Sequence, residues 1–164
     1  MSEDTPFVET LGPAFLAHVM RRVADDLVRA AERWYAEEGV TAPPRTVSTL
    51  LLLSEAGPLA ITEIAGRLEQ SHPLVIRWIR ELEGAGFVAR ERDERDGRRT
   101  LVALTREGQA QVERLGPVLE AMAEVSRDLA AESDLDDLVA GLWRMAGASQ
   151  PSALVERLRE AKAR

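Results

Sequence analysis

The sequence predicts a mainly α-helical fold that contains one small two-stranded sheet. Eight prolines and eleven glycines divide stretches in which apolar residues recur every three or four positions. This helical spacing gives way to two short strand-like runs only between residues 87 and 104. With 45% hydrophobic and 30% charged residues among its 164, the chain has the composition of one folded domain with an ordinary core.

The first part of the chain is expected to hold two helices. Apolar residues at helical spacing predict a long amphipathic helix over residues 11–37. Pro43-Pro44 ends that helix and supplies the start signal for a second one through Val47–Ser54. Gly57-Pro58 then breaks the chain.

Two short helices separated by a three-residue turn come next. Thr62 is a candidate N-cap for a helix over Glu63–Leu68, because its hydroxyl can accept a free backbone N–H. Ser71 is the candidate N-cap of the second helix, which has Pro73 in its first turn and stops at Gly84-Ala85-Gly86.

A β-hairpin follows. Phe87–Arg92 and Arg99–Leu104 are the predicted strands, and Asp96-Gly97 marks the turn because both residues tolerate positive φ. Leu59–Ile61 is a candidate for a very short third strand. The order helix, turn, helix, hairpin is that of a winged helix-turn-helix, in which the hairpin is the wing.

The last third of the chain is predicted to be helical. Thr105 is a candidate cap for a long helix, in which Gly116-Pro117 predicts a kink or break. Two shorter helices are expected at about 134–146 and 152–162, separated by the stretch from Gly147 to Pro151.

The helix after Ser71 has two different faces. Its core face is expected to carry residues at i, i+3, i+4 and i+7, namely Val75, Trp78, Ile79 and Leu82. A second stripe with the same spacing lies about 200° away around the helix. It consists of Pro73, Ile76, Arg77 and Arg80.

This second stripe has the chemistry needed to enter the major groove of DNA. An arginine there can donate two hydrogen bonds to guanine, and Ile76 can touch a thymine methyl group. The alternative is an ordinary solvated face, with Arg77 paired to Glu81 four residues on. The hairpin favours the first interpretation, because Arg95 and Arg98 flank its turn and a single arginine on a thin loop suits the narrow minor groove.

From Ile61 to Gly108 the sequence resembles the MarR family of bacterial and archaeal regulators. The wing pattern Asp-x-Arg-Asp-x-Arg followed by Leu-Thr-x-x-Gly is fairly specific to that family. About fifty residues match well, and the flanking helices match only by position and length. The matching segments are Ile64-Ala65-Gly66-Arg67-Leu68, Gly86-Phe87-Val88, Asp93-Glu94-Arg95-Asp96-Gly97-Arg98 and Leu104-Thr105-Arg106-Glu107-Gly108.

The resemblance implies a homodimer on palindromic double-stranded DNA, with Arg95 in the minor groove and the wing braced by pairing of Asp93 with Arg98. It divides this single domain into a DNA-binding lobe, 45–108, and dimerisation helices, 11–37 and 109–164. Ile76 departs from a position that is often Thr or Ser, and Gly116-Pro117 interrupts a helix that is commonly continuous. The expected DNA contacts are Arg67, Ser71, His72, Pro73, Ile76, Arg77, Arg80, Arg95 and Arg98, and the wing-bracing residues are Asp93, Asp96 and Gly97.

Family members often bind small aromatic or anionic effectors that release DNA. His18, Trp34 and Tyr35 on the first helix and Arg45 before the second are therefore candidate pocket residues. Core packing explains Trp34 equally well, since it continues an apolar stripe. We expect no metal and no cofactor, because the chain has two histidines and no cysteine.

Neither catalysis nor a membrane span is expected. The chain has no phosphate-cradling glycine loop and no nucleophile or zinc motif, so an enzyme is not predicted. It has no long apolar run, and its start lacks the pattern of a signal peptide, so a cytoplasmic location is expected.

The net charge and its distribution along the chain are compatible with two functional hypotheses. The net charge is −7, yet residues 59–106 contain nine arginines against eight acidic residues. A dimeric repressor relieved by a small molecule is the first hypothesis. A winged helix that binds another protein without binding DNA is the alternative, motivated by the acidic total and by an apolar Ile76 on the outer face.

Overall fold

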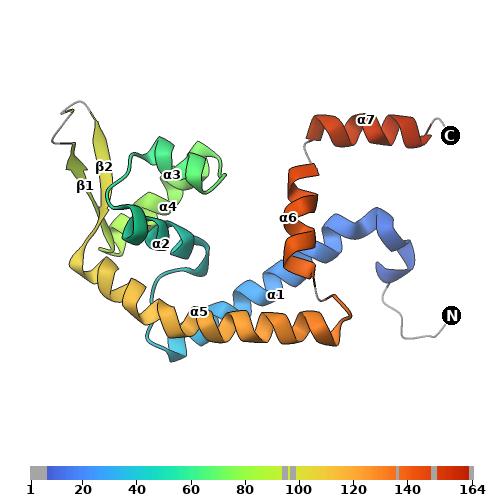
Figure 1. Cartoon of the computed structure of the whole chain (residues 1–164), viewed down its shortest axis with the longest axis horizontal. Helices are drawn as coiled ribbons and strands as arrows, with labels where there is room; N and C mark the ends of the chain where they lie inside the picture. The colour runs from blue at the N-terminus through green and yellow to red at the C-terminus, as the bar shows by residue number, and fades with distance from the viewer. Residues whose placement is uncertain (1–6, 94–95, 97–98, 136, 149–150, 163–164) are drawn as a thin grey trace. The chain divides into compact units, whose positions relative to one another are not determined.

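The computed structural model describes residues 7–93, 96, 99–135, 137–148 and 151–162 (Figure 1). The chain separates into two compact units, Met1–Leu119 and Glu120–Arg164. The first unit holds every element before the long helix α5, together with the part of α5 up to Leu119. The second holds the rest of α5 and the two helices that follow it.

The N-terminal helix is shorter than the sequence predicts. A 3-10 segment, η1, covers Glu9–Phe15, and the α-helix α1 covers Leu16–Glu37. Gly12 has a φ of 60°, which lies in the left-handed region, and Pro13 has no backbone N–H. The expected start at residue 11 is therefore wrong, because these two residues prevent a regular helix before Leu16.

The second helix agrees with the prediction. A short 3-10 turn, η2, spans Pro44–Thr46 and leads directly into α2, Val47–Ala56. The helix ends at Gly57, whose φ of 76° and ψ of −162° form a backbone conformation that glycine adopts readily.

Helix α3, Ile61–Arg67, begins with a different cap from the one expected. Ala60 occupies the N-cap position, and the carboxylate of Glu63 accepts the Ala60 backbone N–H at 2.8 Å. Thr62 lies inside the first turn, so its assignment as the cap is wrong. A glutamate at the third helical position performs the same task, which is to satisfy a backbone N–H left free at the start of the helix.

Helix α4, His72–Gly84, starts and is oriented as predicted. Ser71 occupies the N-cap position, although its side chain makes no capping hydrogen bond, and Pro73 lies in the first turn. The predicted core stripe is confirmed, since all four of its members are buried. Their exposed fractions are 0% for Val75, 8% for Trp78, 0% for Ile79 and 0% for Leu82.

The hairpin consists of β1, Val88–Arg92, and β2, Thr100–Leu104. The strands are antiparallel, and the register places Val88 opposite Leu104. Figure 1 shows the pair as a narrow ribbon beside the helices of this lobe. Only Leu59 of the expected third strand pairs with it, through two backbone hydrogen bonds to Val102 of 2.8 and 3.1 Å.

Helix α5, Arg106–Glu132, is anchored to the preceding lobe at its first turn. The Thr105 hydroxyl accepts the Gly108 N–H at 3.1 Å and donates to the Gly86 carbonyl at 2.6 Å. The predicted cap is therefore confirmed. The helix does not break at Gly116-Pro117, because α5 continues through Pro117, with the side chains of Leu115 and Val118 buried on both sides of this point. The kink that the sequence also allows stays a prediction.

The second unit contains the end of α5 and the helices α6, Leu138–Ala148, and α7, Pro151–Lys162. α6 begins four residues later than expected. Asp134 adopts a φ of 55°, and the Leu135 N–H donates to the Ala130 carbonyl at 2.8 Å, which closes the end of α5.

Gly108→Ala should destabilise the protein by about 1–3 kcal/mol. A Cβ at this position would lie 2.0 Å from the Phe87 carbonyl oxygen, so the α5 anchor would have to move. Gly116→Ala in the same helix is the matched control, because a Cβ there meets nothing within 4 Å. It should stabilise by about 0.5–1 kcal/mol, and urea unfolding in which both variants shift equally would contradict this packing.

Candidate nucleic-acid interface

The side of α4 opposite its buried stripe is open to solvent. Pro73, Arg77 and Arg80 are exposed, whereas Ile76 is half-buried. Ser71 and His72, at the start of α4, are also exposed, as is Arg67 at the end of α3. The predicted residues of these two helices thus lie at the end of α3, at the start of α4 and along the outer side of α4, where all but the half-buried Ile76 are exposed.

Neither Arg77 nor Arg80 forms an ion pair within the part of the chain that the structure describes. The pairing of Arg77 with Glu81, which would have made this an ordinary solvated face, is not formed. Glu81 instead accepts two hydrogen bonds from Arg45, from Nη2 at 2.7 Å and from Nε at 3.3 Å. The hydrogen bonds and the charge of Glu81 raise the pKa of Arg45 above its ordinary value.

A second forked pair joins α4 to the first strand. Arg90 on β1 donates from Nε to Oε1 of Glu83 at 2.9 Å and from Nη2 to Oε2 at 3.1 Å. Planar two-point pairing of this kind fixes both side chains more firmly than a single contact does. Arg90 and Glu83 therefore fasten the end of α4 to the base of the wing.

The tip of the wing, with Arg95, Gly97 and Arg98, lies outside the described residues. The proposed pairing of Asp93 with Arg98 therefore stays a prediction. At the base, the Asp96 N–H donates to the Asp93 carboxylate at 3.4 Å, and the Arg99 N–H donates to the Asp96 carbonyl at 2.8 Å. The Asp93 carboxylate and the Asp96 carbonyl thus each accept a hydrogen bond that stabilises the turn.

An ion pair that the sequence analysis did not anticipate joins the wing to α3. Arg99 Nη2 lies 3.0 Å from Glu63 Oε2, and its Nη1 lies 3.9 Å from the Asp93 carboxylate. Glu63 thus serves as both the α3 cap and the partner of the wing. The hydrogen bond from the Ala60 backbone, and then the contact with Arg99, lower the pKa of Glu63 below its ordinary value. A glutamate three residues after Ala60 was the available sequence signal.

The four candidate effector residues do not converge within one chain. His18 and Trp34 lie sixteen residues apart on α1, which separates them by about 24 Å along the helix axis. His18 borders a shallow hollow with Arg21, Arg22, Asp25 and Arg29 of the same helix.

The other two candidates, Tyr35 and Arg45, are buried and ion-paired respectively. Tyr35 is buried, which raises the pKa of its hydroxyl, and Trp34 beside it is half-buried. Arg45 is engaged by Glu81. The pocket role of these residues stays a prediction.

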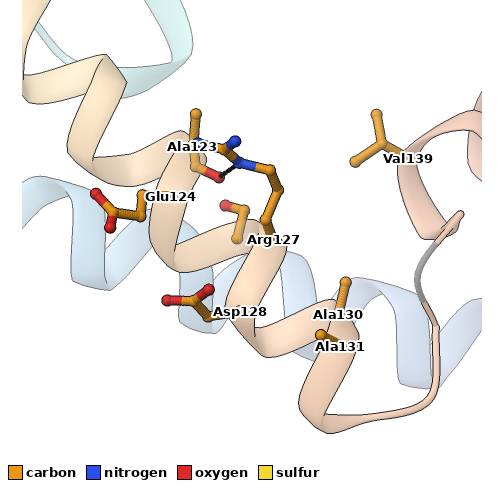
Figure 2. A pocket seen from close by; sticks show the side chains of 8 residues that line it. Ala123, Glu124, Arg127, Asp128, Ala130, Ala131 and Val139 are labelled. Atoms are coloured by element: carbon orange, nitrogen blue, oxygen red, sulfur yellow. Dashed lines mark hydrogen bonds between the residues drawn. The ribbon is translucent and has the colours of Figure 1, made fainter.

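Another hollow lies in the second unit, between the end of α5 and the start of α6. Figure 2 shows Glu124, Arg127 and Asp128 along α5, with Val139 facing them from α6. Arg127 Nε donates to the Ala123 carbonyl of its own helix at 3.2 Å. None of the candidate effector residues lines this hollow.

Within the described ranges, no group of three or more His, Cys, Asp or Glu side chains has the arrangement needed to hold a metal ion. No helix among these residues is long and apolar enough to cross a membrane.

The comparison with protein families identifies the helix-turn-helix and most of the hairpin. Residues 43–100, about a third of the chain, match the sequence model of the MarR family. This segment is therefore similar to the MarR family. The match includes α2, α3, α4 and β1, and it covers both arginines of the exposed α4 face. Among curated protein sequences, none matches the chain.

Several solved structures, among them transcriptional regulators, share the fold over most of the chain. The transcriptional repressor CouR, bound to a 23-mer DNA duplex, is 26% identical with a TM-score of 0.67, covering 80% of this chain and 92% of CouR. The S. aureus MepR–DNA complex is 22% identical with a TM-score of 0.67, covering 80% of this chain and 96% of MepR. PcaV from Streptomyces coelicolor, with its natural ligand, is 22% identical with a TM-score of 0.66, covering 92% of this chain and all of PcaV.

Titration of Glu63 should give a pKa below the ordinary glutamate value, and the value should rise only in part in Arg99→Ala. The Ala60 N–H is the larger cause and survives that substitution. A lowered pKa stabilises the folded state above the ordinary glutamate pKa, and this contribution is lost as pH falls through the lowered one. Side-chain carbon NMR measures both values, and a Glu63 pKa that does not change in Arg99→Ala would contradict the α3–wing link.

Proposed function

We propose that the chain is a dimeric, sequence-specific DNA-binding transcriptional repressor whose α4 is the recognition helix. The observation that carries this proposal is the exposed face of α4. Arg77 and Arg80 stand opposite a fully packed stripe and have no acidic partner among the described residues. The DNA-bound CouR and MepR structures, which share the fold, support the same conclusion.

The chemistry of this face suits the major groove. Each arginine can donate two parallel hydrogen bonds to O6 and N7 of a guanine. Ser71 and His72 at the start of α4, together with Arg67, are exposed, and we propose that they contact backbone phosphates. Ile76 retains some exposed surface for a thymine methyl group, but its partial burial limits this contact.

We propose that the wing reads the minor groove through Arg95, with Arg98 supporting the turn. The base of the hairpin is held by contacts among Asp93, Asp96 and Arg99, which supports this proposal. An arginine on a narrow ribbon matches the enhanced negative potential of a narrow minor groove.

Dimerisation is supported by apolar side chains that one chain leaves uncovered. On α1 these form a stripe at helical spacing: Leu16, Val19, Met20, Val23, Leu27 and Val28. Exposed apolar surface of this extent usually marks an interface. A two-fold axis would present two α4 helices to half-sites about 10 base pairs apart, which explains the proposed palindrome.

A small aromatic or anionic effector is proposed to relieve repression. PcaV was solved with its natural ligand, and His18 borders a hollow that three arginines flank. The alternative of a protein-interaction module loses support, because the partial burial of Ile76 reduces the apolar outer face that motivated it. A role on chromosomal DNA also fits the expected cytoplasmic location.

Arg77→Ala and Arg80→Ala should each weaken binding to the operator by about 10-fold, because each removes a two-point contact to a base. Fluorescence anisotropy with the chain's own upstream intergenic duplex measures this. Arg157→Ala on α7 is the control, since it removes the same charge elsewhere and should bind normally. Wild-type affinity no higher for the upstream duplex than for a scrambled one would contradict sequence-specific binding.

Sedimentation at micromolar concentration should give twice the 18.1 kDa of one chain. Val23→Glu should shift the protein toward the monomer, because it places a charge within the apolar α1 stripe. Arg29→Glu, on the polar side of the same helix, should leave the dimer intact. A monomeric wild-type chain would remove the basis for a palindromic site.

A further inference from the structure

Both acidic side chains of α4 are held by arginines that come from other elements. Arg45 of η2 binds Glu81, and Arg90 of β1 binds Glu83, each through two hydrogen bonds. The two glutamates are about 30% exposed, so water does not separate the charges fully. Two different parts of the lobe thus make the same kind of contact with one helix.

Within α4 itself, each glutamate has a competing partner. Glu81 lies four residues after Arg77, and Glu83 lies three residues after Arg80. These are the spacings at which opposite charges pair on one helix face. In an isolated helix the two arginines of the exposed face would therefore be partly neutralised by their own neighbours.

In the structure, both glutamates pair with arginines of other elements and not with the arginines of α4. No ion pair links Arg77 with Glu81 or Arg80 with Glu83 in the part of the chain that is described. The planar guanidinium groups of Arg45 and Arg90 each occupy both oxygens of a carboxylate, which leaves little capacity for a second cation.

We propose that Arg45 and Arg90 are positioning residues that hold Glu81 and Glu83 away from Arg77 and Arg80, so that the cations of the exposed α4 face stay available to DNA. This inference rests on the proposed DNA-binding function. This pairing would help DNA binding in two ways. The N–H donors of Arg77 and Arg80 stay available, and the negative charges of the two glutamates, which would repel DNA phosphates, are neutralised.

Charge-swap rescue in the full-length chain tests this proposal. Arg45→Ala should weaken binding to the upstream duplex by about 3- to 10-fold, because Glu81 becomes free to pair with Arg77. Glu81→Gln should bind at least as tightly as the wild type. The double variant Arg45→Ala/Glu81→Gln should return to within about 2-fold of wild-type affinity.

The second pair gives an independent repeat with Arg90→Ala, Glu83→Gln and their combination. The matched control is Arg159→Ala, which breaks the exposed pair of Arg159 with Glu156 on α7, formed at 3.0 Å. This control should bind DNA normally. Thermal unfolding of every variant checks that the lobe remains folded.

The outcomes separate the possible roles. If the double variant Arg45→Ala/Glu81→Gln still bound DNA weakly, the proposal would be overturned, because Arg45 would then contact DNA itself. Weakened binding in Glu81→Gln would also overturn it, since the pair would matter only as a structural link. If the wild-type chain binds no duplex, the proposed function fails and this inference with it; if it binds and rescue fails, only this inference fails.

Discussion

The burial of one stripe of α4 fixes the orientation of the helix on which the proposed function depends. Val75, Ile79 and Leu82 have no solvent-exposed surface, and Trp78 has little. Turning α4 by even one residue would carry these side chains into water at a cost of about 1.5–3 kcal/mol each. Because the core holds this face inward, the side with Arg77 and Arg80 must face outward. The exposure of the proposed reading face is thus a consequence of core packing.

Polar contacts then connect the elements around this helix. Glu63 caps α3 and pairs with Arg99 of the wing, while Thr105 joins the start of α5 to the loop after α4. Arg45 and Arg90 fasten the two glutamates of α4. Individually, such exposed pairs contribute little to stability. Their importance here lies in deciding which arginines remain unpaired in a chain whose net charge is −7.

Local patterns were sufficient to predict most elements of the lobe. The core stripe of α4, the Ser71 position, the hairpin and the Thr105 cap follow from spacing and from the chemistry of single residues. The remaining features depend on tertiary contacts, which local patterns do not show. Pro117 lies within a continuous α5, which buried neighbours on both sides keep helical. Glu81 pairs with Arg45, which lies 36 residues away in the sequence, instead of with Arg77 on its own helix.

Affinity cleavage of DNA tests the orientation of α4 most directly. The wild-type chain contains no cysteine, so Ser71→Cys creates a single attachment site for an iron chelate at the exposed start of α4. We expect two clusters of cuts in the major groove, about 10 base pairs apart, and none from the cysteine-free wild type treated in the same way. Uniform or absent cleavage on a duplex that the labelled protein still binds would contradict the claim that α4 enters the groove.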